Sequence, residues 1–298
     1  MLQELLMKYS KKVLLLGSNN FITDYLIKLS DNEKINYFFL KEKILKEDLE
    51  MDDIEFFQKY LYFDNEEFDT IILSIHFPIE NLKIDYNVKL AQKIYTYLKT
   101  KNSKLIYISS IRSNPYSNSE YGLSKFNTEK IINKYDNFVI IRPSTIIHKA
   151  NGTIFGGKKG ITIKKISNII KKYRIFLIPG SGKQQHTYCT LDSLCKFIRL
   201  NILENYFSNT TVNFFSGEYI SFKKFINLLA LNMNIRVKLI FIPLFFFKIL
   251  FYIIDFLNMI GLKKITNVEK NSFLNLFNDN IEYDYTSKIE KNINDLKI

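Results

Sequence analysis

Short apolar runs alternate with segments of helical periodicity along the first half of the chain. The runs occupy residues 12–16, 35–40, 70–75, 104–109 and 137–141, and apolar residues recur at helical spacing in 21–29, 87–98 and 121–135. Strands separated by helices predict a parallel sheet that is buried on both faces. Functional residues of such a sheet gather at the carboxyl ends of its strands. The residues at these ends are Gly17, Ser74, Ser109, Ser110, Arg142 and Pro143.

The pattern changes after Pro143. Residues 151–160 are rich in Gly and Lys, and a basic segment of helical periodicity follows at 161–173. Apolar runs at 175–178 and 211–215 predict two strands that return to the main sheet. We therefore expect an α/β protein with a doubly wound parallel sheet and a smaller α/β C-terminal substrate domain. The expected bounds are 11–150 for the sheet domain, to which 175–215 returns, and 151–174 with 216–298 for the smaller domain.

The composition limits the possible functions. With 298 residues and 47% hydrophobic content, the chain is long enough to fill two cores. Its formal net charge of +12 comes with lysines scattered along the chain and without a nucleic-acid-binding motif, so we expect no nucleic-acid partner. Two cysteines, Cys189 and Cys195, argue against a disulfide framework or a structural metal. The segment 1–12 lacks the features of a signal peptide, which favours the cytoplasm.

The strongest chemical pattern is a tyrosine followed four residues later by a lysine, Tyr121 and Lys125, at the start of a predicted helix. Four residues are about one helical turn, so the two side chains share a face. A nearby ammonium lowers the pKa of a phenol and lets it exchange a proton with a substrate hydroxyl near neutral pH. Ser110, at the end of the preceding strand, is expected to hold the same oxygen by a hydrogen bond. A tyrosine and a lysine at this spacing are common by chance, and the preceding serines favour the catalytic interpretation.

An ordered set of motifs between Lys12 and Ile240 resembles the extended short-chain dehydrogenase/reductases. The set consists of a strand ending in Gly17 with Phe21-Ile22, then Asn87, Leu105 to Ser110, Tyr121 to Lys125 with Glu129, Arg142-Pro143-Ser144, and Pro179 to Gly182. Within that family the chain is similar to the NAD-dependent epimerase/dehydratase branch, which acts on nucleotide sugars. The resemblance implies a Rossmann-type fold, with Tyr121 as catalytic acid/base, Lys125 as its tuner and ribose contact, and Ser110 as the hydroxyl partner.

The same resemblance implies a nicotinamide dinucleotide, NAD or NADP, as cofactor. The residues expected to bind it are Gly17, Asn20, Phe21, Ile22, Lys41, Ser74, Asn87, Tyr121, Lys125 and Pro143. The residues expected to contact the substrate are Ser110, Thr145 and His186. No metal is expected. The family also implies a homodimer through residues 87–98 and 121–135, because it commonly pairs these helices.

The chain departs from the family's cofactor pattern at several positions. The family's GxxGxxG falls on Gly17, Asn20 and Thr23, so two of the three glycines are replaced. Asn tolerates a left-handed conformation, whereas Thr23 brings a β-branched side chain to a point where helix, strand and pyrophosphate crowd together. Lys41, with Lys43 nearby, takes the place of the acid that normally holds the adenosine ribose. A cation there would suit a 2′-phosphate and favours NADP(H), unless Lys41 is a solvated surface residue.

The expected substrate site also differs from the family pattern. His186 stands where the family often has an arginine that grips the substrate diphosphate, and a neutral histidine is a poorer clamp. Ser193 replaces the second of two consecutive acids, the first being Asp192. The short loop between Ser110 and Tyr121 opens the space above the substrate. Both a nucleotide-linked and a polyprenyl-diphosphate-linked sugar therefore remain open as substrates.

Residues 239–262 form the most apolar stretch of the chain. On a helix, Lys248, Tyr252, Asp255 and Asn258 would fall on one narrow polar stripe. The two charges in its middle argue against a membrane-spanning helix. Two interpretations remain, namely burial in the second domain and a helix that lies peripherally on the inner face of an anionic membrane, between basic flanks.

The main functional hypothesis is an NAD(P)-dependent epimerase or keto-reductase that acts on a diphosphate-activated sugar, in surface polysaccharide biosynthesis. The alternative is a non-catalytic relative that keeps the fold as a binding or scaffold subunit. The lost glycines favour the alternative, whereas Ser110, Tyr121 and Lys125 together favour the enzyme. A third interpretation is a general carbonyl or lipid-linked sterol-type reductase.

Overall fold

The computed structural model describes residues 10–17, 20–29, 34–40, 42–61, 67–77, 85–117, 120–150, 153–155, 161–215, 220–243, 245–246, 249 and 252. For residues 148–150, 153–155, 161–165 and 186 only the backbone is described. The described residues divide into two compact units. The first unit contains those up to Ser144 and those from Cys189 to Phe215, and the second contains those from Thr145 to Tyr188 and those after Phe215 up to residue 252.

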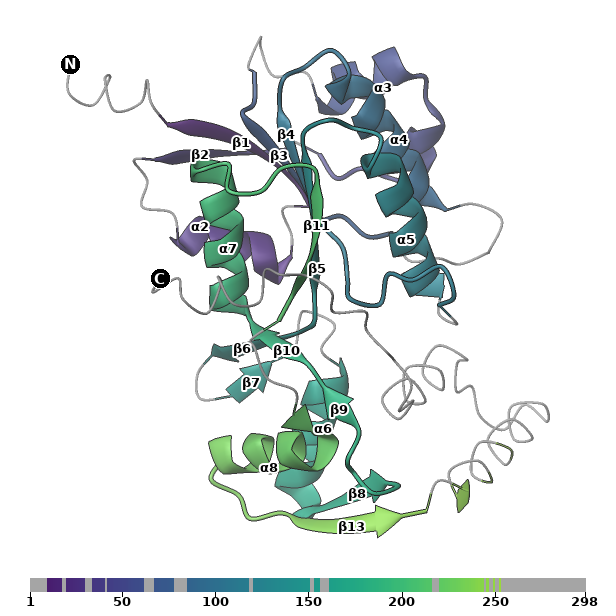
Figure 1. Cartoon of the computed structure of the whole chain (residues 1–298), viewed down its shortest axis with the longest axis vertical. Helices are drawn as coiled ribbons and strands as arrows, with labels where there is room; N and C mark the ends of the chain where they lie inside the picture. Colours follow the sequence, from purple (N-terminus) through teal and green to yellow (C-terminus); the bar gives the residue numbers. More distant parts are fainter. Residues whose placement is uncertain are drawn as a thin grey trace. The chain divides into compact units, whose positions relative to one another are not determined.

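A six-stranded parallel sheet forms the centre of the first unit (Figure 1). Its strands, in sheet order, are β11 (Thr210–Phe214), β5 (Phe138–Pro143), β4 (Lys104–Ile108), β3 (Thr70–Leu73), β1 (Lys11–Leu16) and β2 (Ile35–Phe39). The residues of β3 and β4 are all buried, as continuous runs of Ile and Leu are in a sheet covered on both faces. The expected strands at the first five apolar runs and at 211–215 are confirmed, and so is the α/β fold class.

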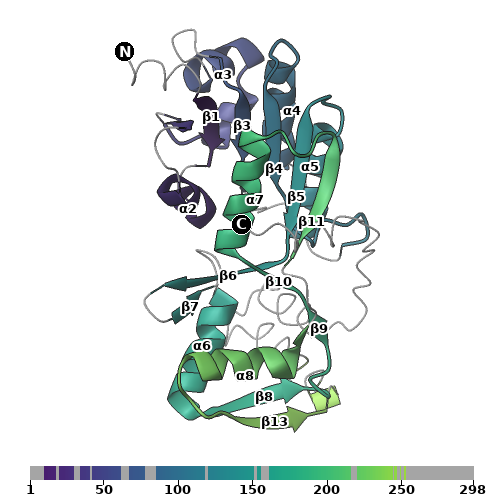
Figure 2. The ribbon, with the colours of Figure 1, turned by 60° about the vertical axis from the view of Figure 1, so that its left-hand side comes forward.

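Helices cover both faces of this sheet. Figures 1 and 2 show α3, α4 and α5 over one face and α2 and α7 over the other, and the helix pairs α4–α5 and α2–α7 pack against each other. The helices of the unit are α2 (Phe21–Leu29), η1 (Glu47–Glu50, a 3₁₀ turn), α3 (Asp53–Tyr60), α4 (Tyr86–Leu98), α5 (Glu120–Ile132) and α7 (Leu191–Leu203). The core between the sheet and α4 includes the fully buried Leu14, Ile71 and Ile94.

The direction of strand order reverses between β1 and β3. From β1 the chain adds β2 on one side, whereas β3, β4 and β5 follow on the other side. Such a switch point is where an open α/β sheet binds its ligands, outside the carboxyl ends of the strands. Here Gly17 follows β1 and Ser74 follows β3, and the N–H of Ser74 donates to the Leu16 carbonyl at 2.9 Å.

The second unit is smaller and is built from strand pairs and two longer helices. Its elements are β6 (Thr145–Ala150), β7 (Thr153–Phe155), α6 (Ile161–Tyr173), β8 (Ile175–Pro179), β9 (Gln185–His186), β12 (Ile220–Ser221), α8 (Phe222–Asn232) and β13 (Lys238–Ile242), and β10 (Tyr188–Thr190) leads back into the first unit. The pair β8–β13 is parallel, whereas β6–β7 and β9–β12 are antiparallel. Buried Ile170, Ile178 and Phe222 contribute to its core.

Two expectations for this region are wrong. The strand at 175–178 does not return to the main sheet, because β8 pairs with β13 in a sheet of their own. Its alternating burial, with Phe176 and Ile178 inside and Leu177 exposed, is that of a strand packed on one face only. Residues 239–262 do not form one helix, since 239–242 belong to β13. The rest of that stretch lies largely outside the described residues.

Candidate active site

A tight turn follows β1. Gly17 has a φ of +114°, a conformation that L side chains rarely adopt. A Cβ at this position would lie 2.7 Å from Ser74 Oγ and 3.0 Å from the backbone N of Ile75. The first glycine of the family pattern is therefore required for the close approach of the ends of β1 and β3.

Asn20 precedes α2 and caps it. Its Oδ1 accepts the N–H groups of Ile22 at 3.0 Å and of Thr23 at 3.1 Å. Its Nδ2 donates to the Gly17 carbonyl at 2.6 Å and to Ser74 Oγ at 2.8 Å. Asparagine is a favoured residue at this helix position, because its side-chain oxygen satisfies otherwise unpaired N–H groups. One side chain thus joins the end of β1, the end of β3 and the start of α2.

Thr23, in the first turn of α2, packs against the residues that connect β1 to this helix. The residue is fully buried (0% exposed), and its Oγ1 lies 2.9 Å from the Asn20 carbonyl and 3.2 Å from the Gly17 carbonyl. The hydroxyl uses backbone acceptors of the turn, so the β-branched side chain fits where the family has glycine. Lys41, expected to select NADP(H), lies outside the described residues.

The three residues expected to be catalytic lie at the carboxyl edge of the sheet, beyond β4. Ser110 follows β4, and Tyr121 and Lys125 occupy successive turns of α5. The Ser110 hydroxyl lies near enough to the Tyr121 phenol to lower its pKa. Lys125 is buried (4% exposed); its Nζ donates to the Ile108 carbonyl at 2.9 Å and lies 5.9 Å from the centroid of the Tyr121 ring.

The pKa values of Tyr121 and Lys125 differ from those expected from the sequence. Desolvation raises the pKa of the Tyr121 phenol, and the nearby Ser110 hydroxyl and the charge of Arg112 only partly offset that rise. Burial lowers the pKa of Lys125 to about 8, against the opposing effect of the Glu129 and Asp85 carboxylates. The expected lowering of the phenol pKa by Lys125 is therefore not found, and Tyr121 keeps its proton at neutral pH.

No protein-family model and no curated protein sequence matches the chain. Solved structures do match it. A dTDP-4-dehydrorhamnose reductase from Yersinia enterocolitica has a TM-score of 0.61 and 18% identity, over 78% of this chain and 84% of that one. A UDP-glucuronic acid 4-epimerase from Bacillus cereus, in complex with NAD, has a TM-score of 0.60 and 16% identity, over 78% and 86%. A dTDP-4-dehydrorhamnose reductase from Bacillus anthracis, in complex with NADP, has a TM-score of 0.58 and 16% identity, over 80% and 86%.

The chain has the fold of the extended short-chain dehydrogenase/reductases. In this fold the side chain of Asn87 contacts other residues of the protein. Its Oδ1 accepts the N–H of Phe77 at 2.7 Å, and its Nδ2 lies within hydrogen-bonding distance of the Phe77 carbonyl (3.0 Å) and Ser124 Oγ (3.1 Å). The side chain expected to bind cofactor thereby holds the loop after β3 against α5.

That loop carries a residue that sequence reasoning missed. The His76 ring lies edge-on to Tyr121, with ring centroids 4.8 Å apart and an interplanar angle of 78°. Arg112 is a second missed neighbour; its N–H donates to Ser110 Oγ at 3.2 Å. A Cβ on Gly122 would overlap the Arg112 carbonyl, so Gly122 lets the loop after β4 approach α5. No motif marked these two positions, because both lie in loops.

A buried ion pair lies next to the group of Ser110, Tyr121 and Lys125. Glu129 of α5 is 2% exposed; its Oε1 accepts the Nε–H of Arg142 at 3.0 Å, and its Oε2 pairs with the same guanidinium. Ser109 Oγ also donates to this carboxylate. The pair joins α5, β4 and β5, and Pro143 ends β5 at the same edge of the sheet.

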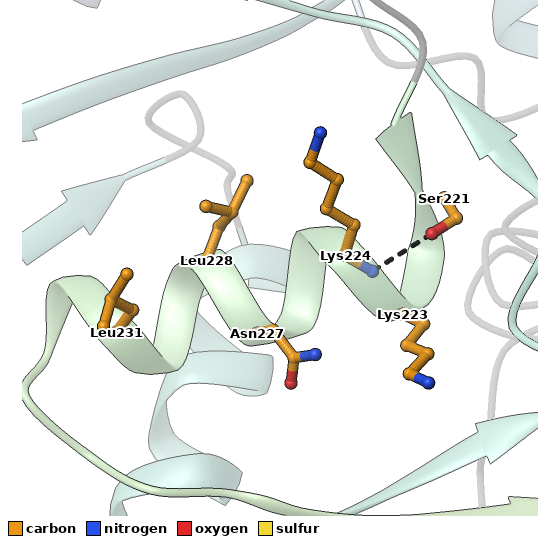
Figure 3. A pocket seen from close by; sticks show the side chains of 6 residues that line it. All are labelled: Ser221, Lys223, Lys224, Asn227, Leu228 and Leu231. Carbon is orange, nitrogen blue, oxygen red and sulfur yellow. Dashed lines mark hydrogen bonds between the residues drawn. The ribbon is translucent and has the colours of Figure 1, made fainter.

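The expected substrate residues Thr145 and His186 belong to the second unit, in β6 and β9. The second unit also has a surface pocket of about 360 Å³ along one side of α8 (Figure 3), lined by Ser221, Lys223, Lys224, Asn227, Leu228 and Leu231. Both lysines are exposed. Among the described residues no cluster of His, Cys, Asp and Glu could hold a metal ion.

Proposed function

We propose that the chain is an NAD(P)-dependent epimerase or keto-reductase that acts on a diphosphate-activated sugar. The observation that carries the proposal is that Ser110, Tyr121 and the buried Lys125 gather at the carboxyl edge of a doubly wound sheet, with Lys125 Nζ 5.9 Å from the centroid of the Tyr121 ring. Solved proteins with this fold include a dTDP-4-dehydrorhamnose reductase bound to NADP and a UDP-glucuronic acid 4-epimerase bound to NAD. A scaffold subunit would need none of the three side chains.

In this proposal Tyr121 exchanges a proton with the substrate oxygen. Its raised pKa keeps the phenol protonated near neutral pH. A protonated phenol donates its proton to the carbonyl oxygen when a ketone is reduced. Ser110, whose hydroxyl lies near the phenol, would donate to the same oxygen. A protonated Tyr121 is thus compatible with the proton donation that reduction of a keto-sugar requires.

In this proposal the diphosphate of a dinucleotide binds where β1 ends and α2 begins. N–H groups at the start of a helix are the donors that bind phosphates in this class of sheet, and Phe21 and Ile22 open α2. Gly17 keeps the backbone close to Ser74 without a side chain between them. When bound, the dinucleotide supplies or accepts the hydride at the sugar carbon.

Replacement of Tyr121 tests the function. Tyr121→Phe keeps the ring but removes the exchangeable proton, so turnover of dTDP- and UDP-linked 4-keto-sugars should fall by about 10² to 10⁴. The assay follows oxidation of the reduced nicotinamide by absorbance. Tyr116→Phe is the matched control, because Tyr116 lies on the loop before α5 and is 88% exposed. A Tyr121→Phe rate near that of the parent would refute the catalytic role.

One observation favours the alternative of a non-catalytic scaffold, namely that Asn20 already uses the N–H groups of Ile22 and Thr23. Under that alternative the protein neither turns over a keto-sugar nor binds a dinucleotide. Tyr121-dependent oxidation of reduced nicotinamide would exclude it.

A homodimer is part of the proposal. Helices α4 and α5 pack side by side on one face of the sheet, and a second copy could add the same pair to make a four-helix contact. Light scattering at micromolar protein should then give twice the mass of the 35.3 kDa chain. A monomer under these conditions would contradict this part.

The proposal also includes peripheral contact with an anionic membrane. Such contact would go with a polyprenyl-diphosphate-linked sugar as substrate. No helix among the described residues has the length and apolarity needed to cross a bilayer. Phe245, Phe246 and Ile249 are 55%, 52% and 49% exposed, and apolar side chains near cations favour anionic lipid surfaces. The protein should float with anionic vesicles at low salt, and Phe245→Asp should weaken flotation. Failure to float would exclude the membrane contact.

A further inference from the structure

Asn20 uses the helix donors that a dinucleotide diphosphate would need. The first N–H groups of a helix have no partner within the helix and are the natural ligands of phosphate. In α2 the N–H groups of Ile22 and Thr23 both donate to Asn20 Oδ1. The side-chain carbonyl therefore stands where a phosphate oxygen would accept.

The opposite end of the same amide is also held. Asn20 Nδ2 donates to the Gly17 carbonyl and to Ser74 Oγ, and Thr23 Oγ1 reaches the carbonyls of Gly17 and Asn20. Rotation of the Asn20 side chain away from α2 would break its hydrogen bonds at both ends. A diphosphate that binds the N–H groups of Ile22 and Thr23 must therefore displace the Asn20 side chain, which is also hydrogen bonded at the ends of β1 and β3.

We propose that Asn20 is an affinity-determining residue: its side chain occupies the N–H groups of Ile22 and Thr23, so that the dinucleotide binds loosely and exchanges in every turnover. This rests on the proposed function and narrows it to a keto-reductase. An epimerase oxidises and re-reduces with one retained cofactor, whereas a reductase must release the spent dinucleotide each cycle. Competition between the Asn20 side chain and the diphosphate favours release of the dinucleotide.

The test compares two substitutions of opposite expected effect. Asn20→Gly removes the competing carbonyl at small cost to the helix, since glycine is tolerated at this position. Asn20→Asp keeps the acceptor and adds a negative charge. Asp52→Gly is the matched control, because Asp52 caps α3 in the same way, accepting the Glu55 N–H at 2.9 Å.

Binding of NADPH, NADH, ADP and adenosine to each protein is measured by titration calorimetry. Release of one or two competing hydrogen bonds predicts that Asn20→Gly lowers the Kd of the three diphosphate ligands about tenfold. Asn20→Asp should raise it by a similar factor. Adenosine, which lacks phosphate, should bind the parent and the Asn20 variants equally, and Asp52→Gly should match the parent for every ligand. Thermal melts establish that each variant is folded.

Two results would overturn the inference. One is a folded Asn20→Gly protein that binds NADPH no more tightly than the parent, and the other is a parent protein that retains stoichiometric dinucleotide through gel filtration. Failure of the proposed function looks different, because neither NADPH nor NADH would then bind to any variant, Asn20→Gly included. That result would refute the function and the inference together.

Discussion

The buried charge of Lys125 predicts that its removal stabilises the folded protein. Burial lowers the pKa of its ammonium from 10.5 to about 8, so the folded protein binds this proton less tightly than the unfolded chain does. Below about pH 8 the lysine is charged in both states, and the full cost of the buried charge is present. As pH rises from about 8 to 10.5 that cost disappears, because the unfolded lysine also becomes neutral.

The magnitude for Lys125→Met follows from this difference. The fall of the Lys125 pKa from 10.5 to about 8 means that the buried charge lowers the free energy of unfolding by roughly 3 kcal/mol at neutral pH. Methionine has a similar length without the charge, but it leaves the Ile108 carbonyl without the 2.9 Å hydrogen bond from Nζ, at a cost of about 1 kcal/mol. The variant should therefore be more stable than the parent by about 2 kcal/mol near neutral pH. Above the ordinary lysine pKa it should be less stable by about 1 kcal/mol.

Urea unfolding of both proteins near neutral pH and at about pH 10 measures this change. Lys130→Met is the control, since Lys130 is an exposed lysine on the same helix. Its effect on the free energy of unfolding should be small. A Lys125→Met protein that is less stable than the parent at neutral pH, or whose difference from the parent does not vary with pH, would refute the reasoning.

Three further predictions concern neighbouring features. Lys41→Asp should reduce the preference for NADPH over NADH about tenfold, measured as a ratio of Kd values, and equal effects on both cofactors would make Lys41 a surface residue. Glu129→Gln should lower the free energy of unfolding by about 3 kcal/mol, because it leaves the Arg142 guanidinium without its partner; a loss under about 1 kcal/mol would contradict this. His76→Ala should lower kcat about tenfold with little change in KM, and His76→Phe should restore it by keeping the ring against Tyr121. Equal rates for the two His76 variants would show that the ring contact does not position the phenol.

Local patterns predicted the main sheet well because its four central strands, β5, β4, β3 and β1, are largely apolar runs whose residues are mostly buried. The same reasoning failed for 175–178, whose residues are equally apolar. Burial on one face and pairing with β13 distinguish that strand, and neither property can be read from a four-residue run. The partner strand lies more than fifty residues later, within the stretch that was expected to be helical.

The positions of the candidate catalytic residues followed from helix spacing and strand ends, which are local. Their neighbours did not, because His76 and Arg112 reach Tyr121 through loop conformation alone. The glycine pattern likewise revealed that Asn20 replaces a glycine, but not that its amide joins the ends of β1 and β3. Such contacts depend on strand order, which brings Ser74 beside Gly17 across more than fifty residues.

The charge of Lys125 shows most clearly why spacing alone does not determine chemistry. Its place one turn after Tyr121 predicted an ammonium that stabilises tyrosinate, yet its Nζ donates to the Ile108 carbonyl, 5.9 Å from the Tyr121 ring centroid. Desolvation then dominates both groups, raising the pKa of the phenol and lowering that of the ammonium. A protonated phenol is ready to donate, not to abstract, a proton. The competition with the diphosphate proposed for Asn20 and the protonated Tyr121 are therefore both compatible with the proposed reduction of a ketone with exchange of cofactor.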